Sequence, residues 1–214
     1  NRPSWEVINA DLTDFSAAPY KGVDLFAGGV PCPPFSIAGK QLGADDERDL
    51  FPTALRLIRE CDPKSVMLEN VRGLSSPKFK EYREWIILEL GKLGYETFWD
   101  LILSSNFGVP QLRPRFVLVA LKKEFAPYFK YPKDNNLRTT VSETIWDLMG
   151  ENDWSGLSAW KKKAENIAPT IVGGSKKHGG ADLGPTRAKQ QWLELGVDGK
   201  GIANEAPNSS DPKD

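Results

Sequence analysis

Short apolar runs alternate with helix-like segments through about the first 95 residues, and this alternation limits the fold more than any other feature. Residues 23–27 and 65–69 are compact apolar runs typical of buried strands. Residues 49–61 and 77–93 carry apolar side chains at helical spacing, each on one face. Alternating strands and helices predict an α/β fold, in which a mostly parallel sheet is covered by helices.

Three further strands are expected, at 5–8, 96–103 and 115–121. The last two have no helix between them, so an antiparallel hairpin joined by the loop 104–114 is predicted. After about residue 125 the chain is rich in glycine, proline and asparagine, with a helix-like piece at 141–149 and a basic, tryptophan-bearing stretch at 154–163. The pattern predicts a first domain at 1–124 and a loop-rich region at 125–214, with a disordered tail from about Asn208.

Composition excludes several classes of protein. No apolar run approaches the roughly 18 residues of a membrane span, so no membrane partner is expected. Two cysteines, Cys32 and Cys61, and the single His178 do not indicate a disulfide framework or a structural zinc site, and they fit a reduced intracellular compartment. The net charge of −1 gives no global sign of nucleic-acid binding, but a local basic face would be sufficient for phosphate contacts.

Chemically distinctive side chains follow the predicted strands. Cys32 lies on a stiff glycine- and proline-rich loop after strand 23–27, and Glu69 closes strand 65–69. Arg113 and Arg115 stand where the loop 104–114 meets the last strand. In an open parallel sheet, ligands bind beyond the carboxyl ends of the strands, so all four are expected at one edge.

This set of groups suits attack on an electron-poor ring. Nearby guanidinium groups lower the pKa of a thiol and favour its reactive thiolate. A carboxylate within hydrogen-bonding distance of a ring nitrogen could share a proton and activate the ring. Taken singly, Cys32 could equally be an inert residue in a structural turn, Glu69 could simply be solvated at a strand end, and Arg113 and Arg115 could pair with surface acids.

Several motifs in order give the chain a resemblance to the C5-cytosine DNA methyltransferase family. Gly29–Ser36 (GVPCPPFS) resembles the family's Pro-Cys loop, and Glu69–Val71 (ENV) resembles its E-N-V motif. Gln111–Arg115 (QLRPR) resembles its Q-x-R-x-R motif, and the preceding Asn106–Pro110 fits as well. Asp11–Leu12 stands where the family has an acidic residue that contacts the adenine end of S-adenosylmethionine. The resemblance covers residues 1–121.

The resemblance implies a partial Rossmann-like sheet of a S-adenosylmethionine-dependent methyltransferase, followed by a target-recognition region. Cys32 would attack C6 of a cytosine flipped out of duplex DNA, and Glu69 would bind N3 and the exocyclic amine. Arg115, together with Arg113, would hold the base. The cofactor would be S-adenosyl-L-methionine, bound by Asp11, Leu12, Pro31 and Leu50. Double-stranded DNA would be contacted by Ser36, Gln111, Lys176, Lys177 and Arg187.

The chain also departs from the family pattern. Pro33 replaces the usual glutamine after the cysteine, the glycine-rich first cofactor motif is not found, and the final helix motifs are missing. The chain is therefore expected to be inactive alone and to need a complementary methyltransferase segment or subunit, in a bacterial cytoplasm or nucleoid. Alternatives are a non-catalytic DNA-binding fragment and an RNA cytosine-5 methyltransferase; a thiol hydrolase lacks a suitably placed histidine.

Overall fold

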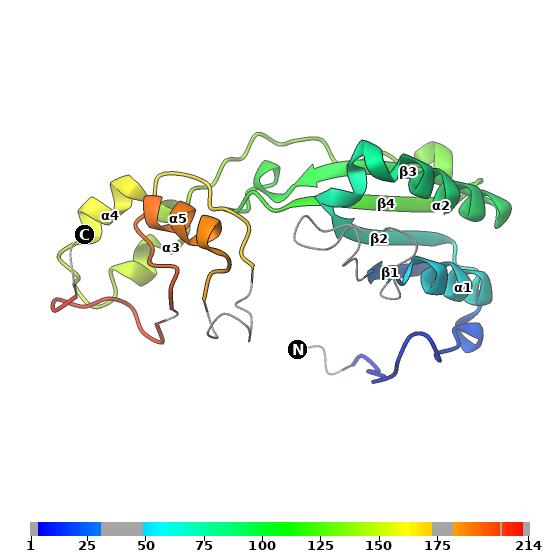
Figure 1. The fold of residues 1–214 in the computed structure, drawn as a ribbon, viewed down its shortest axis with the longest axis horizontal. Helices are drawn as coiled ribbons and strands as arrows, with labels where there is room; N and C mark the ends of the chain where they lie inside the picture. The colour runs from blue at the N-terminus through cyan, green and yellow to red at the C-terminus, as the bar shows by residue number, and fades with distance from the viewer. Residues whose placement is uncertain (1–3, 31–48, 173–181, 202, 212–214) are drawn as a thin grey trace. The chain divides into compact units, whose positions relative to one another are not determined.

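The computed structural model describes residues 4–30, 49–172, 182–201 and 203–211 (Figure 1). The chain forms two compact units. Unit 1 comprises Asn1–Leu101 and Arg115–Tyr131, and unit 2 comprises Ile102–Pro114 and Pro132–Asp214. The division at 124/125 expected from sequence stays a prediction. By contacts, 102–114 groups with the second unit and 125–131 with the first.

A four-stranded mixed sheet forms the centre of unit 1. Its strands are β1 (Leu25–Gly29), β2 (Ser65–Val71), β3 (Tyr95–Leu103) and β4 (Pro114–Lys122), in the order β1-β2-β4-β3. β1 pairs with β2 in parallel, and β2 pairs with β4 antiparallel. The backbone N–H of Ser104 donates to the carbonyl of Arg113 at 3.4 Å, so neighbouring β3 and β4 are joined as the antiparallel hairpin expected. β3 is therefore parallel to β1 and β2.

Two helices cover one face of this sheet. The helices are α1 (Phe51–Cys61) and α2 (Lys80–Lys92), which a short 3-10 turn at Pro77–Phe79 precedes. Along β2 and β4 the side chains alternate between buried and more exposed, as expected when one face is covered. The core between sheet and helices is mainly aliphatic and includes Leu55, Ile58, Leu68, Ile86, Leu90, Leu118 and Ala120. Helical spacing correctly predicted both helices, although α2 begins three residues after the expected proline.

The segment after β4 packs on the sheet by aromatic contacts. The ring of Phe129 lies 5.1 Å from that of Phe98 and 5.0 Å from that of Tyr131, centroid to centroid. The Tyr131 hydroxyl donates to the carbonyls of Phe98 and Val117, at 3.1 and 2.9 Å. These contacts explain why 125–131 belongs to unit 1.

Unit 2 has a core of its own, built around tryptophan. Its helices are α3 (Val141–Met149), α4 (Leu157–Lys163) and α5 (Thr186–Glu194). Their inward faces and the intervening loops bury Val141, Trp154, Trp160, Ala164, Ala168, Trp192 and Leu195. α3 begins with a capping box, in which Thr140 and Glu143 satisfy each other's backbone N–H groups, and it matches the helix expected at 141–149. The helix α5 was not predicted.

One expectation near the start of the chain was wrong. No strand forms at 5–8: Trp5, Val7 and Ile8 are exposed, and residues 6–11 have no regular structure. Among the described residues, no strand pairs with this segment. In the tail, the N–H of Asn208 donates to Asp211 at 2.8 Å and the N–H of Asp211 donates to the Asn208 carbonyl, so these residues form a turn; the disorder expected from about Asn208 stays a prediction. None of the helices in the described part of the chain has the length and apolar character that crossing a bilayer requires.

Candidate functional site

An ion pair joins Glu69 and Arg115 at the carboxyl end of β2. In the sheet register Glu69 lies opposite Val117 and Val71 lies opposite Arg115, so the two charged residues are diagonal neighbours on one face. The Nε of Arg115 contacts the Glu69 carboxylate directly. The Glu69 side chain remains 43% exposed and that of Arg115 21%, so the carboxylate is open to a ligand while its partner is held in place. Glu69 and Arg115 thus lie at the same edge of the sheet, as the predicted topology implied for these two residues.

The end of β1 lies beside this pair. Gly29 is the register partner of Glu69, and a Cβ placed on Gly29 would come 3.4 Å from a Glu69 carboxylate oxygen. The next residue, Val30, is fastened to β2: its carbonyl accepts a hydrogen bond of 3.4 Å from the buried amide of Asn70. The same side chain accepts the N–H of Val71 at 2.7 Å. Asn70 therefore fixes the last described residue before the Cys32 loop against the strand that carries Glu69.

Five residues expected in the site lie outside the described residues. They are Pro31, Cys32, Ser36, Lys176 and Lys177. Their assigned roles stay predictions. Before Cys32, the structure describes the chain as far as Val30, which lies beside the strand that carries Glu69.

A small apolar cavity of about 200 Å³ lies beside β1, at the carboxyl end of this strand. Two of the predicted cofactor residues, Leu12 and Leu50, line it. The remaining wall comes from the 15–17 segment, from β1 and from α1, and includes Phe15, Ala17, Phe26, Gly28, Gly29, Val30, Thr53, Ala54 and Leu57. The structure thus brings Leu12 and Leu50, 38 positions apart in sequence, to one pocket next to the strand end.

Asp11, the predicted acidic contact, directs its carboxylate into a local turn. It accepts the N–H of Thr13 at 2.8 Å and the Thr13 hydroxyl at 2.7 Å. These two hydrogen bonds, the backbone one first, hold the pKa of Asp11 below its ordinary value. Asp11 does not line the cavity itself, although the adjacent Leu12 does.

Gln111 and Arg113 belong to unit 2, whereas Arg115 belongs to unit 1. Arg113 has a left-handed backbone, with φ of 29°, and its carbonyl accepts from the Ser104 N–H and hydroxyl. Such backbone is uncommon for a residue with a side chain, and it ends the loop so that β4 begins at Pro114. The expectation that Arg113 acts together with Arg115 stays a prediction.

Gln111 takes part in the framework of unit 2. Its side-chain oxygen accepts the N–H of Ile171 at 2.9 Å, and its backbone forms a bridge with Ala168. The glycine-rich segment that begins at Ala168 is therefore tied to the QLRPR motif, which the sequence did not reveal. Arg187 is exposed in the first turn of α5.

Sequence reasoning gave no role to Asn70 or to the pair Arg56 and Glu60. Asn70 stood within the ENV motif, but its burial could not be foreseen without the sheet. Arg56 and Glu60 are spaced at i and i+4 on α1, which predicts an ordinary surface ion pair, and their further contacts depend on tertiary structure. Within the described residues, no group of three or more His, Cys, Asp or Glu side chains could hold a metal ion.

Solved structures with a similar fold include methyltransferase relatives. DNMT2 from Spodoptera frugiperda aligns with a TM-score of 0.52 and 22% identity, over 72% of this chain and 48% of that one. A candidate DNA modification methyltransferase of an E. coli prophage aligns with a TM-score of 0.51 and 23% identity, over 64% of this chain and 40% of that one. At these identities the likeness establishes the fold, which is the partial α/β methyltransferase sheet that the motifs implied.

Sequence relatives are much closer. The Type II methyltransferase M.NaeI of Lentzea aerocolonigenes is 56% identical over 99% of this chain and 52% of its own length. M.NgoMIV of Neisseria gonorrhoeae is 56% identical over 80% of this chain and 55% of its own length. The chain thus spans about half the length of these curated relatives. The family model described as C-5 cytosine-specific DNA methylase matches residues 1–196, more than nine-tenths of the sequence. The chain therefore belongs to the C-5 cytosine-specific DNA methylase family.

Proposed function

We propose that this chain carries the base-attacking part of a DNA (cytosine-5-)-methyltransferase, which transfers a methyl group from S-adenosylmethionine to C5 of cytosine in double-stranded DNA. The observation that supports this best is the Glu69–Arg115 ion pair at the end of β2, beside the end of β1 that leads into Cys32. A carboxylate that is held by a guanidinium yet partly exposed is suited to binding the polar edge of a pyrimidine. M.NaeI and M.NgoMIV, both Type II methyltransferases, support the same reaction within restriction-modification systems.

The chemistry assigned to the chain's own residues is nucleophilic catalysis. The Cys32 thiolate adds to C6 of the ring and forms a C–S bond, while Glu69 holds N3 and the exocyclic amine so that electron density can move to C5. S-adenosylmethionine, when bound, supplies an electrophilic methyl group. After C5 has gained the methyl group it loses its proton to a base. The released electron pair re-forms the C5–C6 double bond as the C6–S bond breaks, which restores the thiolate.

The cavity beside β1 suits part of the cofactor. Its apolar wall of leucine, phenylalanine and alanine side chains fits an aromatic ring such as adenine, and the glycines of β1 permit close approach. Its volume of about 200 Å³ lies below the roughly 300–1,000 Å³ of usual small-molecule sites. We infer that a complementary methyltransferase segment or subunit completes the site, with Leu12, Leu50 and Pro31 on this side of it.

Recognition of DNA falls to the second region of the chain. The target base cannot be reached inside a duplex, so catalysis requires the cytosine to be flipped out, at roughly a few kcal/mol of lost stacking. Lys176, Lys177 and Arg187 would contact bases or phosphates, as would Ser36 at the end of the Pro-Cys loop. Gln111 would act there through the segment it holds, since its amide oxygen already accepts from Ile171.

Substitution of the two central residues tests this function in the full-length protein. Cys32→Ala should abolish methylation, and Glu69→Gln should reduce turnover by at least about 10²-fold because the ring is no longer activated. The matched control is Glu96→Gln, an exposed carboxylate at the start of β3, at the other edge of the sheet. Methylation of a DNA duplex by tritium transfer provides the measurement. Near-normal turnover by Cys32→Ala would refute the assignment.

A further inference from the structure

The Asp11–Ala17 segment forms a wall of the cavity without any helix or strand of its own. Leu12, Phe15 and Ala17 line the cavity from this segment. The internal hydrogen bonds of the segment are confined to the turn at Asp11, whose carbonyl accepts the N–H groups of Asp14 and Phe15 at 3.3 and 3.0 Å and whose carboxylate accepts from Thr13. A wall made of irregular backbone needs an external anchor to keep one shape.

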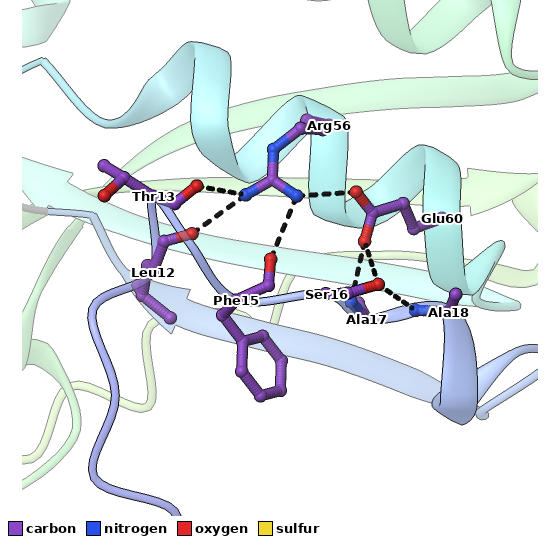
Figure 2. A network of polar contacts seen from close by, with 8 residues as sticks. All are labelled: Leu12, Thr13, Phe15, Ser16, Ala17, Ala18, Arg56 and Glu60. Carbon is purple, nitrogen blue, oxygen red and sulfur yellow. Dashed lines mark hydrogen bonds and ion pairs between the residues drawn. The ribbon is translucent and has the colours of Figure 1, made fainter.

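Arg56 on α1 provides that anchor through three carbonyl groups (Figure 2). Its Nη1 donates to the carbonyl of Phe15 at 2.9 Å, and its Nη2 donates to those of Leu12 and Thr13 at 2.9 and 3.1 Å. The planar guanidinium has five N–H donors in a fixed fork, so it can hold several oxygens at once. A lysine ammonium at this position could not match the same three carbonyls.

Glu60, one turn further along α1, holds the other end of the segment (Figure 2). Its Oε2 accepts the N–H of Ala17 at 2.7 Å and the hydroxyl of Ser16 at 3.1 Å. Its Oε1 pairs with Arg56 Nη1 at 2.5 Å. The backbone hydrogen bond from Ala17, followed by that from Arg56, holds the pKa of Glu60 below its ordinary value, as expected for a carboxylate used as an acceptor.

The anchor reaches Asp11 through Thr13. The Asp11 carboxylate accepts the Thr13 N–H, and the Thr13 carbonyl accepts from Arg56. The same helix also contributes Thr53, Ala54 and Leu57 directly to the cavity. One helix therefore supplies part of the wall and fixes the position of the rest.

We propose that Arg56, together with Glu60, is a positioning residue for the cofactor site: it holds Asp11–Ala17 against α1 in the shape that S-adenosylmethionine binds. This inference rests on the proposed function, because it assumes that the cavity receives this cofactor. Arg56 touches only the backbone of the wall and its own helix partner, so its loss should weaken cofactor binding without impairing the step performed by Cys32 and Glu69.

The test compares Arg56→Met with Arg59→Met in the full-length protein. Arg59 stands on the same helix but pairs with Glu89 at 3.7 Å, so its replacement removes an arginine without releasing the segment. Binding of S-adenosylmethionine is measured by calorimetry, and backbone exchange of 11–17 by hydrogen–deuterium mass spectrometry without cofactor. We expect Arg56→Met to bind S-adenosylmethionine about tenfold more weakly and to exchange its backbone hydrogens faster at 11–17. Its KM for the cofactor should rise while kcat stays nearly unchanged. Arg59→Met should match the wild-type protein in all three measurements.

Arg56→Lys separates positioning from a simple helix ion pair. It keeps the positive charge beside Glu60, so a merely electrostatic role on α1 would be restored, whereas positioning would not. We expect Arg56→Lys to bind the cofactor as weakly as Arg56→Met. Wild-type affinity in Arg56→Met, or unchanged exchange at 11–17, would overturn the positioning role. Lack of binding by the wild-type protein would instead overturn the cofactor site itself.

Discussion

The two compact units of the chain reach a buried core by different routes. In unit 1 most of the core comes from regular strands and helices, and is dominated by leucine, isoleucine, valine and phenylalanine. In unit 2 the core is built around Trp154, Trp160 and Trp192, and Trp154 lies outside any helix. A core of the first kind can be recognised in the sequence, because the apolar residues of regular helices and strands recur at regular spacing. The second kind depends on a few large side chains that meet through irregular backbone, so it leaves no repeating pattern.

The largest expected effect comes from truncating one residue in each core. Trp160→Ala should destabilise unit 2 by about 3–5 kcal/mol, and Leu118→Ala should destabilise unit 1 by about 2–5 kcal/mol. Trp160 is 2% exposed and Leu118 is fully buried, so both leave cavities. Because a small core is concentrated in few residues, Trp160→Ala should remove most of the stability of unit 2.

Hydrogen exchange followed by mass spectrometry shows which unit responds. In Trp160→Ala the peptides of α3, α4 and α5 should lose protection while those of β2 and β4 keep it. In Leu118→Ala the pattern should reverse. Simultaneous loss of protection in both units by either variant would contradict the independence of the two cores.

Much of unit 1 could be predicted because its pattern is local. Helical spacing identified α1 and α2, and alternation identified a sheet whose edge gathers Glu69 and Arg115. The segment 5–8 has the apolar pattern of a strand, but no strand of the described residues pairs with it, and a local pattern cannot show whether a pairing partner exists. In unit 2 the helix α5 was missed because only Trp192 of its nine residues is buried, so no apolar stripe marks it.

The candidate site could be predicted in part for the same reason. The alternation of strands and helices predicted that Glu69 and Arg115 share one edge of the sheet, whereas the strand order and register that pair them come only from the structure. The roles of Asn70, Arg56 and Glu60 could not be foreseen, because each bonds backbone groups about 40 positions or more away in sequence. Backbone carbonyls carry no residue identity, so such contacts leave no motif.

Replacing one glycine by alanine in each unit should change the free energy of unfolding in opposite directions. In unit 2, a Cβ on Gly156 would stand 2.4 and 2.5 Å from ring atoms of Trp154, so Gly156→Ala should cost about 1–3 kcal/mol. In unit 1, a Cβ on Gly91 of α2 meets nothing within 4 Å, so Gly91→Ala should stabilise by about 0.5–1 kcal/mol. Urea denaturation measures both. A neutral Gly156→Ala would show that Trp154 is not tightly packed.

The smallest expected effect is on the pH dependence of stability. It compares a carboxylate that accepts a hydrogen bond from a distant part of the chain with one that accepts a local hydrogen bond. Glu60 accepts from Ala17 across 43 positions, whereas Glu143 in unit 2 accepts from Thr140 across three. Their pKa values are lowered, chiefly by the backbone hydrogen bonds of Ala17 and Thr140. A lowered folded-state pKa gives stability that is complete above the unfolded pKa of about 4.3 and is lost as pH falls through the folded value.

Glu60→Gln should therefore lower the unfolding midpoint of unit 1 by a constant amount between about pH 7 and 5, and the gap should narrow below about pH 4. Glu143→Gln should destabilise α3 alone with the same pH dependence, and this should appear as faster hydrogen exchange at the first turn of α3. Denaturant titrations at several pH values provide the measurement. If the difference in unfolding midpoint between the wild-type protein and Glu60→Gln widens as the pH falls, the role of Glu60 as a charged acceptor is contradicted.

The central claim is that Cys32 attacks a cytosine ring at the edge marked by Glu69 and Arg115. The most direct measurement is covalent trapping, with the full-length protein, S-adenosylmethionine and a DNA duplex that carries 5-fluorocytosine at the target base. A base cannot remove fluorine from C5 as it removes the proton, so the electron pair that would expel the thiolate is not released and the C6–S bond should persist. Mass spectrometry of the digested complex should place the adduct on Cys32, and Cys32→Ala should yield none. An adduct on another residue, or no adduct from an active enzyme, would contradict the account.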